Sequence, residues 1–425
     1  MERTVEHQVT VLEGCEREVR LSLTEAELRP HFDQAYVRAQ AGVSLPGFRK
    51  GKVPVAIIKQ KFGRDIENEA LETIADAEFR NFLKAEPQQV VGTPALTDIA
   101  KGGGGVSFTI RFEVMPDFTL GEYRNLVVQR PVKNVTDEDV EEEIDRIRLR
   151  AASFEPAEKV DGTRYVVTLT MNELDRETGM PIIGAEAKEE RIFLEDENVD
   201  MHLRNSVRDL GVGDSISYVA ETKDANEQPP SYRVTVADVQ KVVPAELTDE
   251  FVSMITGGKI SSESGLRDDI RQQLTSYYEN EAKSAVENQI VEQLVQAHEF
   301  PVPHSLVHSV VHQLFEDFKK RNEGAPGLEK LTAHDLEEQL EPSAIRIVKW
   351  ELIRDKVAAA ENVSVTDEDI VEMSGKVGLT EDQLRMVMRQ NRNVEAQLLA
   401  EKVVKTLVDY AVVNDVDVDQ QQPVL

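Results

Sequence analysis

Apolar and polar residues alternate in two stretches near the start of the chain, and a period of two predicts β-strands with one buried face. Residues 8–22 alternate on both sides of Gly14, which predicts a β-hairpin. Residues 106–114 alternate again, after the glycines at 102–105 and before Pro116. The first part of the chain therefore has strands at both of its ends.

Helical patterns lie between these strands. Thr24 is followed three residues later by Glu27, the spacing of a capping box, so we expect a helix from Thr24 to about Ala41. A second helical stretch is predicted from Asp65 to Ala85. Helices enclosed by strands make residues 1–116 an α+β domain in this interpretation.

A linker and a β-rich region follow. Residues 117–157 are interpreted as a linker with a helix that begins at Thr136, a favourable N-cap, ends near Ala152 and packs with the C-terminal domain. Residues 158–243 contain several alternating runs and predict an inserted β-rich domain with one short helix. Its expected strands are 164–170, 190–194, 215–219 and 232–239.

Helical spacing dominates residues 244–425, which we interpret as an all-α domain. The tail from Asn414 is polar, and we expect it to fray. The expected helices are 266–298, 302–320, 342–360, 366–375, 380–390 and 393–413. The predicted fold class is therefore multidomain α+β.

Composition supports several domains with long, partly solvated helices. A chain of 425 residues exceeds what one core usually supports, and only 5% of its residues are aromatic while 30% are charged. The single cysteine, Cys15, allows no internal disulfide and fits a reducing compartment. We find neither a signal-peptide pattern nor an apolar run of about 20 residues. We therefore expect a cytoplasmic protein with no membrane partner.

Charge singles out one segment. The chain carries 49 Lys+Arg against 79 Asp+Glu, a formal net charge of −30, yet residues 47–64 hold no acidic residue. A positive segment on a negative protein favours approach of that segment to a polyanion. A solvated loop followed by a basic helix start is the alternative interpretation. The basic residues of the segment are Arg49, Lys50, Lys52, Lys59, Lys61 and Arg64.

The order of residues within this segment carries more information than its charge. It contains the octapeptide Gly47-Phe48-Arg49-Lys50-Gly51-Lys52-Val53-Pro54. Its glycines permit unusual backbone angles, and its proline suits the first turn of a following helix. We therefore expect a loop between two helices, with Phe48 at a position that has no obvious core to enter.

This octapeptide resembles the ribosome-docking signature of trigger factor, a family of bacterial ribosome-associated chaperones with an FKBP-type domain. The resemblance implies that Phe48, Arg49 and Lys50 contact a protein and the RNA of the large ribosomal subunit beside the exit tunnel. Gly47, Gly51 and Lys52 complete the implied docking set. The resemblance also implies unfolded nascent polypeptides as a second partner and is compatible with a weak homodimer off the ribosome.

The β-rich region is similar to the FKBP-type peptidyl-prolyl isomerase domain of this family, mainly in its last expected strand and the residues that follow it. However, Thr168 and Leu169 stand where the family pattern has Asp and Phe. The run Asp200-Met201-His202-Leu203 replaces Ile-Pro-Gly-Phe at the short helix. Polar residues cannot form a dry cradle for a twisted imide without a desolvation cost. We therefore predict a retained fold with weak or absent isomerase activity. The candidate pocket residues are Thr168, Leu169, Met201, Leu203 and Tyr232.

Two features of the helical region were considered for function. His304, His308 and His312 share one helix face, but they span ~12 Å, too far for one ion, so we expect no metal. Methionines adapt to many partner shapes, which suits promiscuous binding. The client-binding candidates are Met373, Met386 and Met388, although burial in a core is the simpler fate of each.

The sequence is compatible with three functions: a chaperone, a peptidyl-prolyl isomerase and an RNA-binding protein. No P-loop or nucleophile motif is found, so we expect neither a cofactor nor ATP-driven chemistry. The favoured function is an ATP-independent chaperone that docks at the ribosomal exit tunnel and shields nascent chains. The alternative is a free peptidyl-prolyl isomerase, which the departures in the β-rich region disfavour. An RNA-binding protein proper conflicts with the overall acidity.

Overall fold

The computed structural model describes residues 6–102, 104–175, 178–182, 184–220, 229–324 and 327–418. The chain divides into two compact units. The first contains the residues up to Arg130 together with Ser284–Asp415, and the second contains Pro131–Lys283 and a short stretch from Val416. The predicted multidomain α+β class is confirmed. None of the helices in the described residues is long and apolar enough to span a bilayer.

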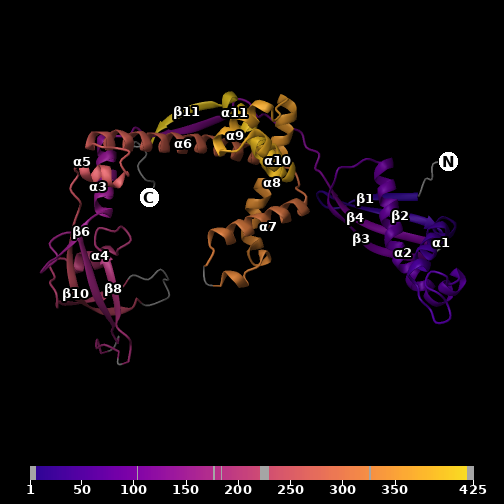
Figure 1. Ribbon diagram of the computed structural model, residues 1–425, viewed down its shortest axis with the longest axis horizontal. Coiled ribbons are helices and arrows are strands. Elements are labelled where there is room, and N and C mark those ends of the chain that lie inside the picture. The colour runs from indigo at the N-terminus through magenta and orange to yellow at the C-terminus, as the bar shows by residue number, and fades with distance from the viewer. Residues whose placement is uncertain are drawn as a thin grey trace. The chain divides into compact units, whose positions relative to one another are not determined.

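The N-terminal part of the first unit is an antiparallel sheet with two helices (Figure 1). The predicted hairpin and the predicted strand at 106–114 are both confirmed. A third long strand was not predicted, because Pro94 interrupts its alternation and its register shifts there. The sheet has the order β1-β2-β4-β3, with β1 (Glu6–Val11), β2 (Glu16–Thr24), β3 (Val90–Gly102) and β4 (Gly105–Val114).

Two helices, α1 (Glu25–Gly42) and α2 (Val55–Ala85), accompany this sheet. The predicted capping box is present, because the backbone N–H of Thr24 donates to Glu27 Oε2 at 2.8 Å. The predicted start of the second helix at Asp65 is wrong. Helix α2 begins directly after Pro54, which takes the N-cap position and continues the octapeptide into the helix without a further loop.

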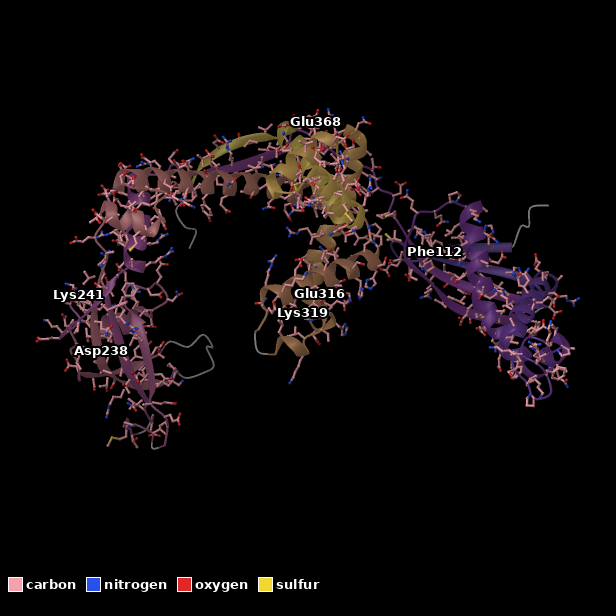
Figure 2. The ribbon with its side chains drawn as sticks, viewed as in Figure 1. Phe112, Asp238, Lys241, Glu316, Lys319 and Glu368 are labelled. Atoms are coloured by element: carbon pink, nitrogen blue, oxygen red, sulfur yellow. The ribbon has the colours of Figure 1, made fainter. Side chains whose placement is uncertain are left out.

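Aromatic rings fill the core between the sheet and α2. Phe112 of β4, labelled in Figure 2, meets Phe79 of α2 edge to face, with ring centroids 5.1 Å apart. Phe82 contacts both rings and is also buried. Apolar residues of β2 and β4 complete this cluster, including the fully buried Val19 and Phe108. The alternation seen in the sequence thus gives each of these strands one buried face.

The rest of the first unit is helical. Helices α6 to α11 lie within a few residues of their predicted ranges, except that α8 begins five residues before its predicted start at 342. The largest cluster buries Ile290, Leu294, Ile353 and Leu407 almost completely. The elements are α6 (Glu263–Ala297), which continues into the second unit, α7 (His304–Arg321), η1 (Leu328–Lys330), η2 (Ala333–Leu336), α8 (Glu337–Glu361), α9 (Asp367–Val377), α10 (Glu381–Gln390) and α11 (Arg392–Tyr410).

The helical part also contains a two-stranded sheet. Strand β5 (Val127–Val132) pairs with β11 (Val412–Asp417), and Arg130 forms an ion pair with Asp415 at 2.7 Å. The prediction that the tail frays from Asn414 is therefore wrong up to Asp417, and residues 419–425 lie outside the described part. The pairing joins residues nearly 300 positions apart, so local sequence could not reveal it.

The second unit contains a five-stranded antiparallel sheet. All four predicted strands are present, and the short β6 was missed. Strand β10 is central: it pairs with β7 along most of its length, and with β9 and β6 near its two ends. The strands are β6 (Ser153–Pro156), β7 (Tyr165–Glu173), β8 (Lys188–Phe193), β9 (Ser215–Val219) and β10 (Ser231–Val243).

Three helices, α3 (Asp137–Arg150), α4 (Met201–Ser206) and α5 (Asp249–Ile255), complete this unit together with the first part of α6. The predicted N-cap of α3 is confirmed, since Thr136 Oγ1 accepts the Asp139 N–H at 3.2 Å. Lys133 also pairs with Asp139 at 2.8 Å. The hydrogen bond from Lys133, with those from Thr136, lowers the pKa of Asp139 to about 2.

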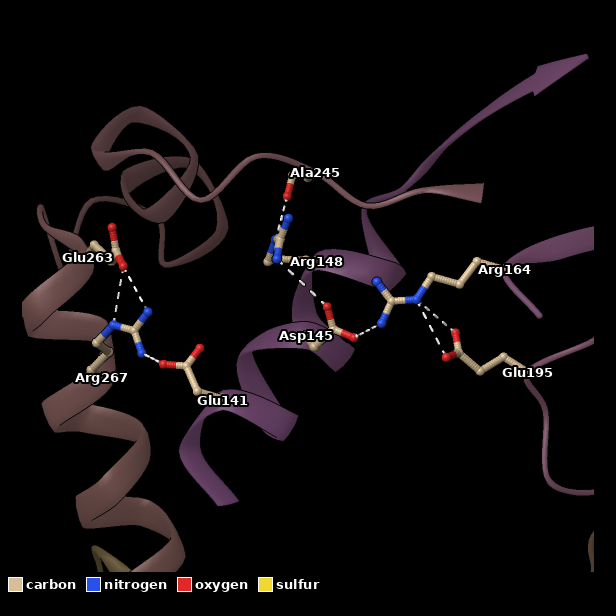
Figure 3. A network of polar contacts seen from close by, with 8 residues as sticks. All are labelled: Glu141, Asp145, Arg148, Arg164, Glu195, Ala245, Glu263 and Arg267. Atoms are coloured by element: carbon tan, nitrogen blue, oxygen red, sulfur yellow. Dashed lines mark hydrogen bonds and ion pairs between the residues drawn. The ribbon is translucent and has the colours of Figure 1, made fainter. Parts of the chain in front are cut away.

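Polar contacts link α3 to both of its neighbours (Figure 3). On one side, Arg267 of α6 pairs with Glu141 of α3 and with Glu263. On the other side, Asp145 of α3 pairs with Arg164, which precedes β7. Arg148 Nε donates to the Ala245 carbonyl at 2.7 Å. Helix α3 is therefore fixed to α6 and to the sheet within one unit.

Candidate functional site

The octapeptide forms most of the loop that joins α1 to α2, residues 43–54, called the basic loop below. Two backbone hydrogen bonds fold it into consecutive turns: Phe48 N–H to the Leu45 carbonyl at 3.1 Å, and Lys52 N–H to the Arg49 carbonyl at 2.9 Å. Gly47 and Gly51 have φ angles of 91° and 78°, a region that side chains with a Cβ rarely adopt. The predicted role of the glycines is confirmed.

A small core of its own supports the basic loop. Tyr36 of α1, Val53 of the loop and Ile58 of α2 are almost fully buried against one another. Gln40 Nε2 donates to the Val53 carbonyl at 2.7 Å and thereby fastens the end of the loop to α1. Burial and a hydrogen bond to the Glu67 carboxylate raise the pKa of Tyr36. The loop is therefore held in one shape by residues on both flanking helices.

Phe48 does not belong to this core. Its side chain is 40% exposed, a large fraction for a phenylalanine. Arg49, Lys50 and Lys52 are also exposed, and none of them forms an ion pair with any residue that the structure describes. The basic loop thus presents one partly exposed ring beside three cations that have no ion-pair partner in the described part of the chain.

A second group of aromatic and basic side chains was missed by sequence reasoning. It lies on residues 117–126, called the strap below, which pack on the helices of the first unit. Phe118 stacks on Phe300 with centroids 3.9 Å apart, and Lys356 lies over the Phe118 ring at 4.2 Å. The Gly121 N–H donates to His298 Nε2 at 2.7 Å. His298 Nδ1 lies 2.7 Å from the Leu294 carbonyl, so the ring links the strap to the end of α6.

The other end of the strap is held by one carboxylate. Glu361 accepts hydrogen bonds from Arg124 and Tyr123, both at 2.6 Å, and from Tyr410 at 2.9 Å. Its side chain is only 11% exposed. These hydrogen bonds, that from Arg124 first, lower the pKa of Glu361 to about 2. In the strap, cations and rings therefore contact each other, although Arg124 also stays partly exposed.

The candidate pocket residues of the middle sheet occupy different environments. Leu169 and Leu203 are buried in the hydrophobic cluster of this sheet, and Tyr232 packs partly against it. Met201 is 72% exposed, and Thr168 is half-buried. Asp200 has a structural role, because its Oδ1 accepts the Leu203 N–H at 2.8 Å and caps α4. The structure does not gather the five candidates around one open pocket.

An open cavity of about 570 Å³ lies beside α4 and β9. None of the five candidate residues lines it. Among the described residues the wall combines an imidazole and two serine hydroxyls with apolar groups, so this part is not the dry aromatic surface that would favour a twisted imide. Its lining residues are His202, Ser206, Ser217, Tyr218, Val219, Ala220 and Pro229.

The candidates of the helical region are also dispersed. Met386 of α10 is 61% exposed, whereas Met373 of α9 and Met388 of α10 are half-buried. On α7, His308 and His312 have ring centroids 4.8 Å apart, and His304 continues the row at 6.3 Å. These imidazoles form an exposed polar face. Within the described residues, no group of three or more His, Cys, Asp or Glu could hold a metal ion.

Two family models match the chain. The model of the bacterial trigger factor protein matches residues 5–147, and the model of the bacterial trigger factor C-terminus matches residues 264–409. All five strands of the middle sheet, β6 to β10, lie between the two ranges.

Curated relatives match over nearly the whole length. Trigger factor of Solibacter usitatus is 29% identical over 375 residues, 85% of this chain and 87% of the relative. Trigger factor of Chlorobium phaeobacteroides is 26% identical over 420 residues, 98% of each chain. A solved structure described as showing promiscuous substrate recognition by the trigger factor chaperone covers 95% of this chain, at 17% identity and a TM-score of 0.49. The relationship is therefore defined by the sequence matches.

Proposed function

The chain belongs to the trigger factor family of ribosome-associated chaperones, and from this premise we propose that its basic loop docks on the large ribosomal subunit beside the exit tunnel. Phe48 enters an apolar site on a ribosomal protein, and Arg49, Lys50 and Lys52 contact RNA phosphates. Gly47 and Gly51 set the shape of the loop. The docked protein shields nascent chains as they emerge, without ATP.

One observation carries this proposal: the exposed Phe48 lies among cations without ion-pair partners, on a loop that its own small core holds in shape. An aromatic anchor with adjacent cations fits a surface that offers both an apolar pocket and phosphates. Because the loop is already ordered, docking loses little conformational entropy. The negative charge of the remaining chain limits non-specific contacts with RNA.

Domain roles follow from the same family. We assign ribosome binding to residues 1–116, a linker and packing helix to 117–157, an FKBP-like domain to 158–243, and client binding to the helical region 244–425. Met386 is the strongest client contact of the three methionines because its side chain is the most exposed. Met373 and Met388 would join it at lower exposure. The protein acts in the cytoplasm, with a weak homodimer as its form off the ribosome.

Replacement of Phe48, Arg49 and Lys50 by alanine tests the docking proposal. We expect ribosome affinity to fall at least about 30-fold, since a central aromatic anchor alone contributes about 2 kcal/mol or more. Cosedimentation of the full chain with ribosomes measures this. Suppression of aggregation by the free protein should persist, because the client-binding region is unchanged.

A matched variant removes cations from the same domain. Arg80 and Lys84 are exposed near the far end of α2, and their replacement by alanine should leave cosedimentation unchanged. Cosedimentation of the triple variant at the wild-type level would contradict the docking proposal.

A second function, weak peptidyl-prolyl isomerisation, is disfavoured by the polar wall of the cavity beside α4. We expect the full chain to accelerate isomerisation of a proline peptide far less than an intact FKBP domain does. A comparable acceleration in the same assay would show that the middle domain is a competent enzyme.

A further inference from the structure

The acid-free segment of the sequence continues beyond the basic loop into the first three turns of α2. Residues 34–64 contain no Asp or Glu, whereas the whole chain has a net charge of −30. Helix α2 turns Ile58 and Gly63 toward buried surroundings and leaves an opposite face exposed. That exposed face carries Gln60, Lys61, Arg64 and Asn68.

The cations of this segment differ in their contacts. The Lys59 ammonium lies 5.4 Å from the centroid of the Tyr36 ring and so takes part in the small core of the loop. Lys61 and Arg64 are exposed and form no ion pair with any described residue, although Asp65 lies four positions after Lys61. Lys61 and Arg64 therefore resemble the cations of the basic loop.

Several basic side chains elsewhere in the described residues form ion pairs with acids, although the exposed Arg29 and Arg80 form none. Arg111 pairs with Glu18, and Lys133 pairs with Asp139. Lys402 pairs with Asp369 at 2.6 Å. Lys61 and Arg64 differ from Arg80 because they belong to the acid-free segment 34–64, where no carboxylate offsets their positive potential.

We propose that Lys61 and Arg64 form a second phosphate-binding group, which extends the docking surface along α2 onto the backbone of ribosomal RNA. This inference rests on the docking function proposed above. Lys61 and Arg64 are three positions apart, which gives an axial offset of about 4.5 Å along α2. From Pro54 to Arg64 the helix adds about 15 Å to the length of the surface.

The chemistry of this face favours RNA over a protein surface. Protein interfaces depend on large apolar or aromatic anchors, and the exposed residues around the two cations, Gln60, Asp65 and Asn68, include none. Phosphates need only positive charge and hydrogen-bond donors, which Lys61, Arg64 and the two amides supply. Phe48 remains the anchor for protein, so the loop and the helix divide the contacts between them.

The test is the salt dependence of ribosome binding. In the full chain, Lys61→Gln and Arg64→Gln are combined, and affinity for ribosomes is measured from 50 to 200 mM salt. Loss of two phosphate contacts should reduce the slope of log affinity against log salt by about 1.4 to 1.8. Between 50 and 200 mM salt, the factor by which the variant's ribosome affinity falls should therefore be about ten times smaller than the factor for the wild type.

Arg80→Gln with Lys84→Gln is the matched control, because it removes the same two charges from the same helix about 30 Å away. Its slope should equal that of the wild type. A wild-type slope for the Lys61/Arg64 variant, or an equal reduction for the control, overturns the inference. Unfolding midpoints of both variants, followed by circular dichroism, should equal that of the wild type because all four side chains are exposed.

Two further experiments distinguish a failure of the α2 contact from a failure of docking itself. A photoreactive amino acid at position 64 should crosslink to RNA in the ribosome complex, and a crosslink to ribosomal protein instead overturns the inference. The Phe48-Arg49-Lys50 alanine variant serves as the reference for docking itself. If that variant loses ribosome binding while the Lys61/Arg64 variant keeps the full slope, docking stands and only the extension along α2 fails.

Discussion

The basic loop and the strap use the same kinds of side chain in opposite ways. Each contains a phenylalanine and an arginine within a short segment, and each involves lysines. In the strap, Phe118 stacks on Phe300 and Arg124 pairs with Glu361. In the basic loop, Phe48 is substantially exposed and Arg49 has no ion pair among the described residues.

This difference shows why composition alone does not identify a binding surface. Cations and rings that contact one another stabilise the fold, and their replacement should lower stability. Cations and rings on an ordered loop without such contacts contribute little to the fold, and their replacement should lower binding. The comparison therefore predicts a clean separation between variants that lose stability and variants that lose ribosome affinity.

The largest effects are expected from the two phenylalanines. Phe48→Ala should weaken ribosome binding about 30-fold and leave stability unchanged, because the ring anchors a complex and not the fold. Phe118→Ala should lower the free energy of unfolding by about 2 kcal/mol and leave ribosome affinity unchanged. Trp350, the single tryptophan, packs against the same core as the strap, so its fluorescence reports this unfolding.

Each phenylalanine variant serves as the control for the other. The separation breaks down if Phe48→Ala lowers the unfolding midpoint as much as Phe118→Ala does. It also breaks down if Phe118→Ala weakens ribosome binding to the same degree as Phe48→Ala.

A smaller effect is expected at Glu361, and it depends on pH. The folded-state pKa of Glu361 is lowered from 4.5 to about 2 by its three hydrogen-bond donors. Its contribution to stability is therefore complete above pH 4.5 and is lost as the pH falls toward 2. Glu361→Gln should be less stable than the wild type at pH 7, and the difference should shrink between pH 4.5 and 2.

Unfolding of both proteins, followed by Trp350 fluorescence over this pH range, measures the shrinking difference. Glu395→Gln on α11 is the matched control, since Glu395 is exposed and forms no ion pair with a described residue. A constant difference between wild type and Glu361→Gln across the range would contradict the assigned role of Glu361.

The smallest effect is expected at Gln40, which shapes the basic loop without being part of it. Gln40→Ala removes the hydrogen bond to the Val53 carbonyl, worth about 1 kcal/mol, and should weaken ribosome binding a few-fold. The slope of affinity against salt should stay at the wild-type value, because no phosphate contact is lost. A changed slope would mean that Gln40 contacts RNA directly.

Local patterns in the sequence predicted the elements that depend on neighbouring residues. The capping box at Thr24, the N-cap at Thr136, the alternation of β4 and the turn glycines of the octapeptide all act within a few positions. Exposure of Phe48 also followed from its place on a loop between helices. These features require no information about distant parts of the chain.

Long-range pairing accounts for what the sequence did not reveal. Strand β11 depends on β5, and the strap depends on Phe300, Lys356 and Glu361, which lie far along the chain. The candidate pocket residues failed to gather for a related reason: Leu169 and Leu203 face a shared core, which alternation alone does not distinguish from a pocket wall. Asp200 differs from the family pattern, and its position directly before α4 allows its carboxylate to cap this helix.

Photocrosslinking from position 48 tests the docking of the basic loop most directly. A photoreactive phenylalanine analogue replaces Phe48 in the full chain, and a second variant carries it at Phe118 as a control. The account predicts that position 48 crosslinks to a protein of the large ribosomal subunit, while position 118 crosslinks only within the chain. Absence of a ribosomal crosslink from position 48, in a variant that still binds ribosomes, would contradict it.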